Sequence, residues 1–272
     1  MIQTKLHIGA SAPFQILHLT DTHLTHADLR DGERKVTLAN KRANIFPEAD
    51  AVLKTASTLS AENHFPIVHT GDLIDFVSIK NLEMANDFIQ KTGAFVAAGN
   101  HEFSLYVGEA KEDTAYRNQS LAIVQKAFQN DIRMSSRMIS GVNFVALDNG
   151  YYLFDEEQLA FLKNEVKKEF PIILLFHTPL FERALYDQIM TEQPCAYLVD
   201  VPETLMQGYP ENRFEQQKAD EITKETVHYI KNEPLIKAII AGHIHKNYEG
   251  LFDGRIPQIT TSCTDIRLIN IT

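Results

Sequence analysis

Residues 14–23 have the sequence FQILHLTDTH. The first part of this stretch is a short apolar run of the kind that forms a buried strand. The strand is expected to end near Thr20, and two polar side chains that bind metals well, Asp21 and His23, follow directly. The stretch therefore predicts a strand that presents metal-binding groups at its carboxyl end.

The same arrangement recurs four more times along the chain. The predicted strands are 66–70, 94–98, 171–176 and 235–241, and they are followed by Gly71-Asp72, by Gly99-Asn100-His101-Glu102, by His177 and by Gly242-His243-Ile244-His245. Helical patterns over 47–63 and 78–91 separate the first three strands, and this alternation predicts parallel strands joined by crossover helices. In such sheets, functional sites gather beyond the carboxyl ends of the strands.

The rest of the chain is less regular. Residues 25–44 are polar with a turn at Asp31-Gly32, and residues 178–214 contain four prolines and show no period, so both are expected to be irregular, the second as a long surface excursion. Further elements are expected as follows: helices over 115–130, 155–168 and 215–232, hairpins over 137–148 and 248–261, and a last strand over 266–271. The β-rich final third predicts a second sheet packed on the first, within a single domain over 1–272.

Composition bounds the function. The chain has 272 residues, 44% of them hydrophobic and 23% charged, which is typical of a globular protein. Its net charge of −10 makes nucleic acid and anionic membranes unexpected partners, because like charges repel. Two cysteines make a disulfide framework implausible, and no apolar run suits a signal core or a membrane span. A cytoplasmic location is therefore expected.

The five motifs supply carboxylate oxygens, one amide oxygen and imidazole nitrogens, but no thiolate. This donor set suits a pair of divalent first-row metals, and iron, manganese and zinc all fit it. Two cations about 3.5–4 Å apart need a bridging anion. Asp72 is the candidate bridge, since its two oxygens can each meet one metal. Paired metals indicate hydrolysis of a phosphate ester.

The ordered set Asp-x-His, Gly-Asp-x-x-Asp, Gly-Asn-His-Glu, His and Gly-His-x-His, spread from Asp21 to His245, resembles that of the calcineurin-like metallophosphoesterase family. The resemblance implies an α/β fold, a four-layer αββα sandwich of two mixed β-sheets flanked by helices, with a dimetal site at one edge. It implies that one metal is held by Asp21, His23, Asp72 and His245, and the other by Asp72, Asn100, His177 and His243.

The resemblance also implies roles for three neighbouring residues. His101 is expected to be a catalytic group beside the phosphate, where it stabilises the transition state or protonates the leaving oxygen. Asp75 and Glu102 match positions at which a carboxylate orients a ligand imidazole. The reaction expected is hydrolysis of a small phosphodiester or phosphomonoester by a metal-bridging hydroxide. The motifs look most like those of the bacterial phosphodiesterase branch.

Two other functions are open on the sequence. A protein-interaction scaffold of the same fold would have eroded ligands, and none is missing here. A nuclease is disfavoured by the acidic balance. Oligomeric state is not predicted.

Several histidines and basic residues near the motifs are expected to have a structural or solvent-facing role and no role in the site. His18 and His69 lie inside predicted strands and are expected to be packed structural histidines. By default, a solvated charged face is expected for the basic residues after the first motif, Arg30, Arg34, Lys41 and Arg42, with a phosphate-anchoring arginine as the alternative.

Overall fold

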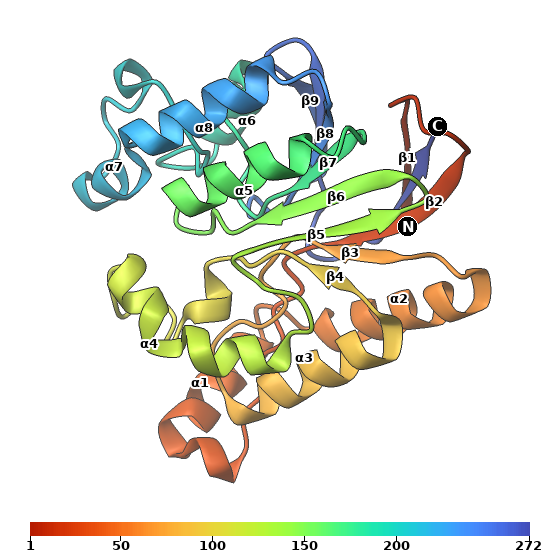
Figure 1. Ribbon diagram of the computed structural model, residues 1–272. Helices are drawn as coiled ribbons and strands as arrows, with labels where there is room; N and C mark the ends of the chain where they lie inside the picture. The colour runs from red at the N-terminus through yellow and green to blue at the C-terminus, as the bar shows by residue number, and fades with distance from the viewer.

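A computed structural model describes residues 1–272. Two β-sheets lie face to face, and helices cover the outer face of each (Figure 1). The layers follow in the order helix, sheet, sheet, helix, so the predicted α/β sandwich of two mixed sheets is confirmed. None of the helices has the length and apolar character needed to cross a membrane.

The first sheet has the order β1-β11-β2-β3-β4. Its strands are β1 (Ile2–Leu6), β11 (Arg267–Ile271), β2 (Phe14–Leu19), β3 (Ile67–His69) and β4 (Phe95–Val96). The last three of these pair in parallel as predicted. Strand β11 pairs antiparallel with β2 and parallel with β1, so the end of the chain returns to the first sheet. The sequence had suggested that the β-rich final third forms the second sheet. This expectation is corrected, because β11 belongs to the first sheet.

The second sheet has the order β5-β6-β7-β8-β10-β9. Its strands are β5 (Met134–Ile139), β6 (Val142–Leu147), β7 (Ile172–Leu175), β8 (Ile236–Ala241), β10 (Ile256–Thr260) and β9 (Tyr248–Phe252). The two predicted hairpins are β5–β6 and β9–β10. At the tip of the second hairpin, Asp253 and Gly254 have φ values of 51° and 66°, as the primed turns of tight hairpins require.

The side chains of the sheets alternate between two cores. In β6, Phe144 and Ala146 point between the sheets, whereas Val145 and Leu147 belong to the core under the helices of the second sheet. This alternation follows from the two-residue period of a strand. Because both faces of the central strands are buried, they are apolar almost throughout, which made them visible in the sequence.

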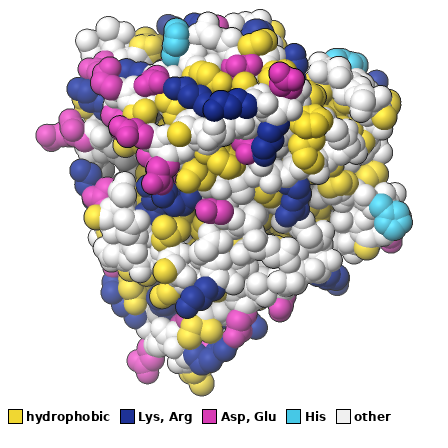
Figure 2. Space-filling view, viewed as in Figure 1, with side chains coloured by type: hydrophobic (Ala, Val, Ile, Leu, Met, Phe, Trp, Pro, Cys, Tyr) yellow, Lys and Arg dark blue, Asp and Glu magenta, His cyan; other side chains and the backbone are white.

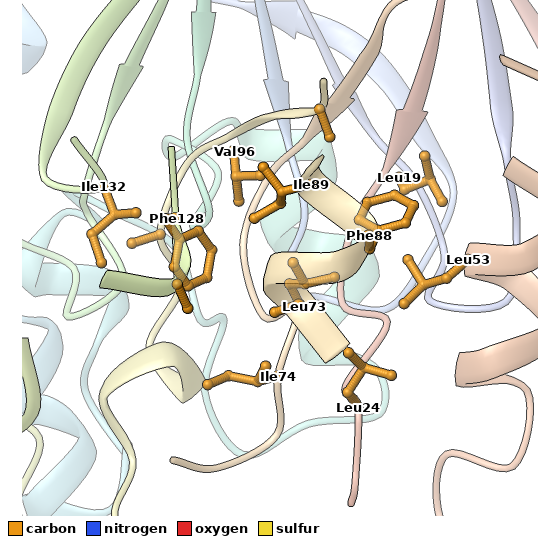
Figure 3. Packing of buried hydrophobic residues seen from close by; sticks show 14 of the residues in the cluster. Leu19, Leu24, Leu53, Leu73, Ile74, Phe88, Ile89, Val96, Phe128 and Ile132 are labelled. Carbon is orange, nitrogen blue, oxygen red and sulfur yellow. The ribbon is translucent and has the colours of Figure 1, made fainter. Parts of the chain in front are cut away.

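Helices α2 (Ala49–Asn63), α3 (Ile79–Thr92) and α4 (Thr114–Val124) cover the first sheet, and α5 (Glu156–Val166) and α8 (Glu221–Asn232) cover the second. Figure 3 shows Phe88 and Ile89 of α3 packed among residues such as Leu19, Leu53 and Val96. The predicted caps are present: Ser78 accepts a backbone hydrogen bond at the start of α3, and Asp155 and Gln158 form a capping box on α5.

Three of the expectations for irregular or helical segments were wrong. The polar segment contains helix α1 (Glu33–Ala43), which buries only Ala39 and so has no apolar stripe to reveal it. The predicted surface excursion contains α6 (Arg183–Met190) and the start of α7 (Glu211–Gln217), and it packs its own core around Leu185, Cys195 and Met206. The helix predicted over 215–232 is broken between α7 and α8.

Candidate metal centre

The predicted site residues follow the strand ends of both sheets. Asp21 and His23 come after β2, Asp72 after β3, His177 after β7, and His243 with His245 after β8. The loops are held together by backbone hydrogen bonds, such as the one from the His23 N–H to the Asp72 carbonyl (2.9 Å). The site therefore lies where the two sheets meet, and it needs both of them.

Five of these residues adopt a left-handed backbone conformation that non-glycine residues normally avoid. Their φ values are 51° for Asp21, 50° for His23, 55° for Asp72, 68° for His243 and 51° for His245. A left-handed conformation at a non-glycine residue costs on the order of 1–3 kcal/mol, and such residues cluster at functional sites. The rest of the fold must therefore stabilise an arrangement that serves these side chains.

The side chains form two clusters. In the first, Nε2 of His245 lies 3.3 Å from Oδ1 of Asp21 and 3.2 Å from Nε2 of His23. In the second, Nε2 of His177 lies 3.2 Å from Oδ2 of Asp72 and 3.0 Å from Nδ1 of His243. Each cluster brings three potential ligand atoms within reach of one cation.

Asp72 links the two clusters through one oxygen. Its Oδ2 lies 3.2 Å from Nε2 of His177 and 3.7 Å from Nε2 of His23. Its Oδ1 instead accepts a hydrogen bond from the backbone N–H of His101 (2.8 Å). Oδ2 thus faces both clusters, whereas Oδ1 is engaged by the backbone of His101.

Two buried acceptor atoms of the site have no hydrogen-bond partner in the chain. Oδ1 of Asp21 and Oδ1 of Asn100 are buried without a hydrogen-bond partner. Burial alone would raise the pKa of Asp72, but the charge of His177 outweighs it and holds that pKa well below its usual value. Burial alone would lower the pKa of His177, but Asp72 and Asp21 raise it to about 9. The two orphaned acceptors fit bound cations, because a buried oxygen without a partner is otherwise costly.

One nitrogen of each of three imidazoles is held by another group. Nδ1 of His177 lies 2.8 Å from the Thr70 carbonyl, and Nδ1 of His23 lies 3.0 Å from Oδ1 of Asp75. Nε2 of His243 lies 2.8 Å from the hydroxyl of Tyr152, a buried residue that sequence reasoning missed. These partners set ring orientation and leave the other nitrogen free toward the clusters, as is usual around bound metals.

Arg42 was also missed as a member of the site. It donates two hydrogen bonds to the buried carboxylate of Asp75, at 2.6 Å and 2.7 Å. Nδ1 of His101 lies 2.7 Å from the backbone carbonyl of Asp75, and the carboxylate of the same residue contacts Nδ1 of His23. In addition, the ring of Phe46 stacks on the ring of His23, with centroids 3.9 Å apart. Because sequence analysis did not reveal α1, it had no reason to set Arg42 apart from a solvated charged face.

Arg42→Met is expected to weaken metal binding by about 10- to 100-fold, the usual effect of removing a group that supports a metal ligand. The physical reason is that Asp75 would keep a buried negative charge without its cation, so that His23 loses a fixed partner. Titration with Zn²⁺ or Mn²⁺ against a competing chelator measures the affinity. Arg30→Met is the control, since Arg30 pairs with Asp28 and Glu83 on the surface. Wild-type affinity in Arg42→Met would contradict this role.

Glu102 was expected to orient a ligand imidazole, but it contacts backbone N–H groups instead. Its carboxylate accepts hydrogen bonds from the backbone N–H groups of Asp72 (2.7 Å), Leu73 (2.7 Å) and Gly99 (2.6 Å). It therefore fixes the two loops that carry Asp72 and Asn100. The side-chain amide of Asn100 donates to Glu112 (3.1 Å), a further contact that the sequence did not indicate.

Two glycines allow the close approach of these loops. A Cβ atom at Gly99 would overlap the carboxylate of Asp72, and one at Gly242 would overlap Thr20 and Asp21. Glycine is needed at both positions for lack of space.

His101 lies beside the clusters with its imidazole 16% exposed. Its ring centroid is 4.7 Å from that of His23. Burial alone would lower its pKa, but Asp72 and Asp75 outweigh burial and raise it to about 10. His18 and His69 are fully buried in the first sheet, and His18 contacts the hydroxyls of Thr70 and Thr261, in keeping with a structural role.

The structure thus brings clustered histidine and aspartate side chains to the edge where the two sheets of an αββα sandwich meet. Comparison of the sequence with protein families matches residues 14–247 to the calcineurin-like phosphoesterases. The chain belongs to this family, which confirms the resemblance seen in its motifs. Membership supports metal-dependent hydrolysis of phosphate esters and implies a dinuclear metal site.

Solved structures resemble this chain at low sequence identity. One is a phosphopantetheinyl hydrolase from Mycobacterium tuberculosis, with a TM-score of 0.50, 11% identity, and coverage of 92% of this chain and 90% of that one. Another is a dimetal phosphatase from Danio rerio, with a TM-score of 0.49, 13% identity, and coverage of 92% and 88%. Comparison with curated proteins gave no match. At these identities the similarity concerns the fold alone.

Proposed function

We propose that this protein hydrolyses phosphodiesters or phosphomonoesters of small molecules at a dinuclear metal centre. The observation that carries the proposal is the position of Oδ2 of Asp72, which faces His23 of one ligand cluster and His177 of the other. The proposed ligands are Asp21, His23, Asp72 and His245 for one metal, and Asp72, Asn100, His177 and His243 for the other. Two ions bound there lower the pKa of water and neutralise charge on the phosphoryl oxygens.

His101 is the proposed catalytic residue of the chain. Its Nδ1 is held by the carbonyl of Asp75, and its backbone N–H is bonded to Asp72, so the ring is fixed beside the ligand clusters. From this position the imidazole can donate to the leaving oxygen or stabilise developing negative charge. The chain thus supplies a positioned proton next to the place where the phosphate would bind.

We also propose the identity of the metals, the domain organisation and the location of the protein. The donor set suits iron, manganese or zinc. The chain is proposed to act as one domain and to work in the cytoplasm, as its low cysteine content suggests.

A panel of phosphomonoesters and phosphodiesters, assayed with Fe²⁺, Mn²⁺ and Zn²⁺, tests the proposal. We expect bound metal near two ions per chain and turnover of at least one ester class. Stoichiometric metal without hydrolysis of any ester, or no bound metal at all, would favour the scaffold instead.

A nuclease function is the second alternative, and surface charge argues against it. The net charge is −10, and Figure 2 shows acidic side chains scattered among the basic ones on the face in view. A polyanion would gain little attraction from such a surface. Cleavage of single-stranded DNA in the presence of Mn²⁺ would overturn this reading.

Removing the metals is expected to lower the melting temperature by at least about 5–10 °C, which is the effect of a single ion. Ligand at 100 times its dissociation constant stabilises a fold by about 2.7 kcal/mol, and 1 kcal/mol moves the midpoint of a protein of this size by about 2–4 °C. Thermal unfolding with and without EDTA, followed by re-addition of Mn²⁺, measures the shift. Identical midpoints under both conditions would show that no metal binds to the folded chain.

A further inference from the structure

A series of hydrogen bonds connects the proposed ligand Asn100 to helix α7. Nδ2 of Asn100 donates to Oε1 of Glu112 (3.1 Å), and Nε2 of Gln216 donates to Oε2 of the same carboxylate (2.9 Å). Oε1 of Gln216 accepts in turn from a guanidinium nitrogen of Arg213 (2.7 Å). The side chains from Arg213 to Asn100 therefore form one connected series.

The charged groups of this series fix the direction of every bond in it. A guanidinium can only donate, so the amide of Gln216 must turn its oxygen toward Arg213. The NH₂ group of Gln216 is then left for Glu112. A carboxylate can only accept, so Asn100 must also turn its NH₂ group toward Glu112. The amide oxygen of Asn100 is thereby directed away from the series.

This oxygen is the atom that a metal would need. Oδ1 of Asn100 is buried and has no hydrogen-bond partner. An amide oxygen suits a divalent cation, whereas the NH₂ group only donates hydrogen bonds. If the amide turned over, its oxygen would face the carboxylate of Glu112 and its N–H groups would face the site. The orientation of this one amide therefore decides whether Asn100 can serve as a ligand.

The series also joins the two halves of the molecule. Asn100 follows β4 of the first sheet, and Glu112 lies in the loop before α4, which packs on that sheet. Arg213 and Gln216 lie on α7, between β7 and β8 of the second sheet. Figure 1 shows α4 and α7 on the same side of the molecule, one in each half. A residue that follows the first sheet is thus oriented by a helix from the other half.

Arg213 has a second contact in the same region. Its guanidinium lies 5.5 Å from the centre of the Tyr197 ring, and that ring lies 5.9 Å from the ring of His243. Residues of the segment 178–217 therefore surround Asn100 and His243, the two residues that are proposed to bind the same metal.

We infer that Glu112 is a positioning residue, which Gln216 and Arg213 hold in place, and that it fixes the amide of Asn100 so that the oxygen can bind one of the two metals. The segment 178–217 thereby takes part in assembling the metal centre. The inference rests on the proposed function and specifies how one metal of that site is retained.

Glu112→Ala is expected to weaken the binding of one metal by about 10- to 100-fold, the usual cost of removing a group that orients a ligand. The ion at the cluster of Asp21, His23 and His245 should bind with little change, because Asn100 is not part of that cluster. Titration with Mn²⁺ against a competing chelator measures the two affinities. Electron paramagnetic resonance should show isolated Mn²⁺ ions in the variant where the wild type shows coupled pairs.

Two further substitutions separate orientation from charge. Glu112→Gln keeps an acceptor for Asn100 but removes the negative charge, so it should recover most of the lost affinity. Gln216→Ala leaves the bond between Asn100 and Glu112 in place. It should weaken the same ion by about 2- to 10-fold, the effect of one ordinary hydrogen bond.

Glu109→Ala and Gln188→Ala are the matched controls. Glu109 lies in the same loop as Glu112 but pairs with Arg34, and Gln188 is exposed on α6. Both controls should bind two ions as the wild type does. Unchanged binding in Glu112→Ala, an equal loss of both ions, or the same loss in Glu112→Gln would overturn the inference.

The titration requires no turnover, so it distinguishes this failure from failure of the proposed function. Two bound ions in the wild type with wild-type affinities in Glu112→Ala would refute the role of Glu112 alone. A wild-type chain that binds no metal would refute the dinuclear centre, and with it the role of Glu112.

Discussion

Asp72→Asn is expected to lose metal and to reduce kcat/KM by about 10³-fold or more. Oδ2 of Asp72 faces both ligand clusters, and an amide in its place would carry no negative charge to attract two cations. Paired metals stabilise the charge of a phosphoryl transition state by several kcal/mol, and each 1.36 kcal/mol is a factor of ten in rate. Metal content by elemental analysis and steady-state kinetics measure the two losses together.

The substitution should leave the fold intact. Asp72→Asn keeps the size of the side chain and can keep the contact between its Oδ1 and the N–H of His101. Circular dichroism should therefore match that of the wild type. Asp50→Asn is the matched control, because Asp50 is 60% exposed and pairs only with His26. Two bound metals with undiminished turnover in Asp72→Asn would refute the assignment of Asp72 as the bridge.

His101→Ala is expected to keep both metals and to slow turnover. A positioned general acid contributes typically about 10²–10⁴-fold in rate, and this is the loss expected in kcat. The loss should fall on kcat more than on KM, because the proton matters in the transition state rather than in substrate binding. Metal analysis must accompany the kinetics, since His101 shares Asp75 with His23.

His26→Ala is the control for this second substitution. His26 also follows the first motif, but its imidazole is 37% exposed and lies 3.0 Å from Asp50. Its removal should leave kcat unchanged. If His101→Ala loses its metals in parallel with its activity, then His101 acts through the stability of the site and not as a proton donor.

The candidate ligand residues were identifiable before the fold. Asp21, Asp72 and His177 each follow a short apolar run, and such runs are visible because both faces of the central strands are buried. The alternation of strands and helices then placed all strand ends at one edge. The local sequence pattern was enough to find these residues, because they directly follow the strands that position them.

The two segments predicted to be irregular, 25–44 and 178–214, lack one continuous hydrophobic period, and their helices were missed for this reason. Helix α1 buries almost nothing, so no apolar stripe identified it. The chain from α6 to α7 buries Leu185, Cys195 and Met206 against one another, but these residues come from separate short pieces. Periodicity detects one long face on one element, and it fails where a core is assembled from several short ones.

The amino-acid sequence by itself determined the αββα class, the strand-end position of the candidate ligands and the kind of metal they suit, because these depend on local periodicity and on the chemistry of single side chains. Only the tertiary structure decided that one oxygen of Asp72 faces both clusters. It also decided that Arg42 contacts Asp75 and that the hydroxyl of Tyr152 contacts His243. Tyr197 and His243 line the same cavity. These contacts join residues far apart in the chain, so they depend on how the loops pack and leave no local pattern.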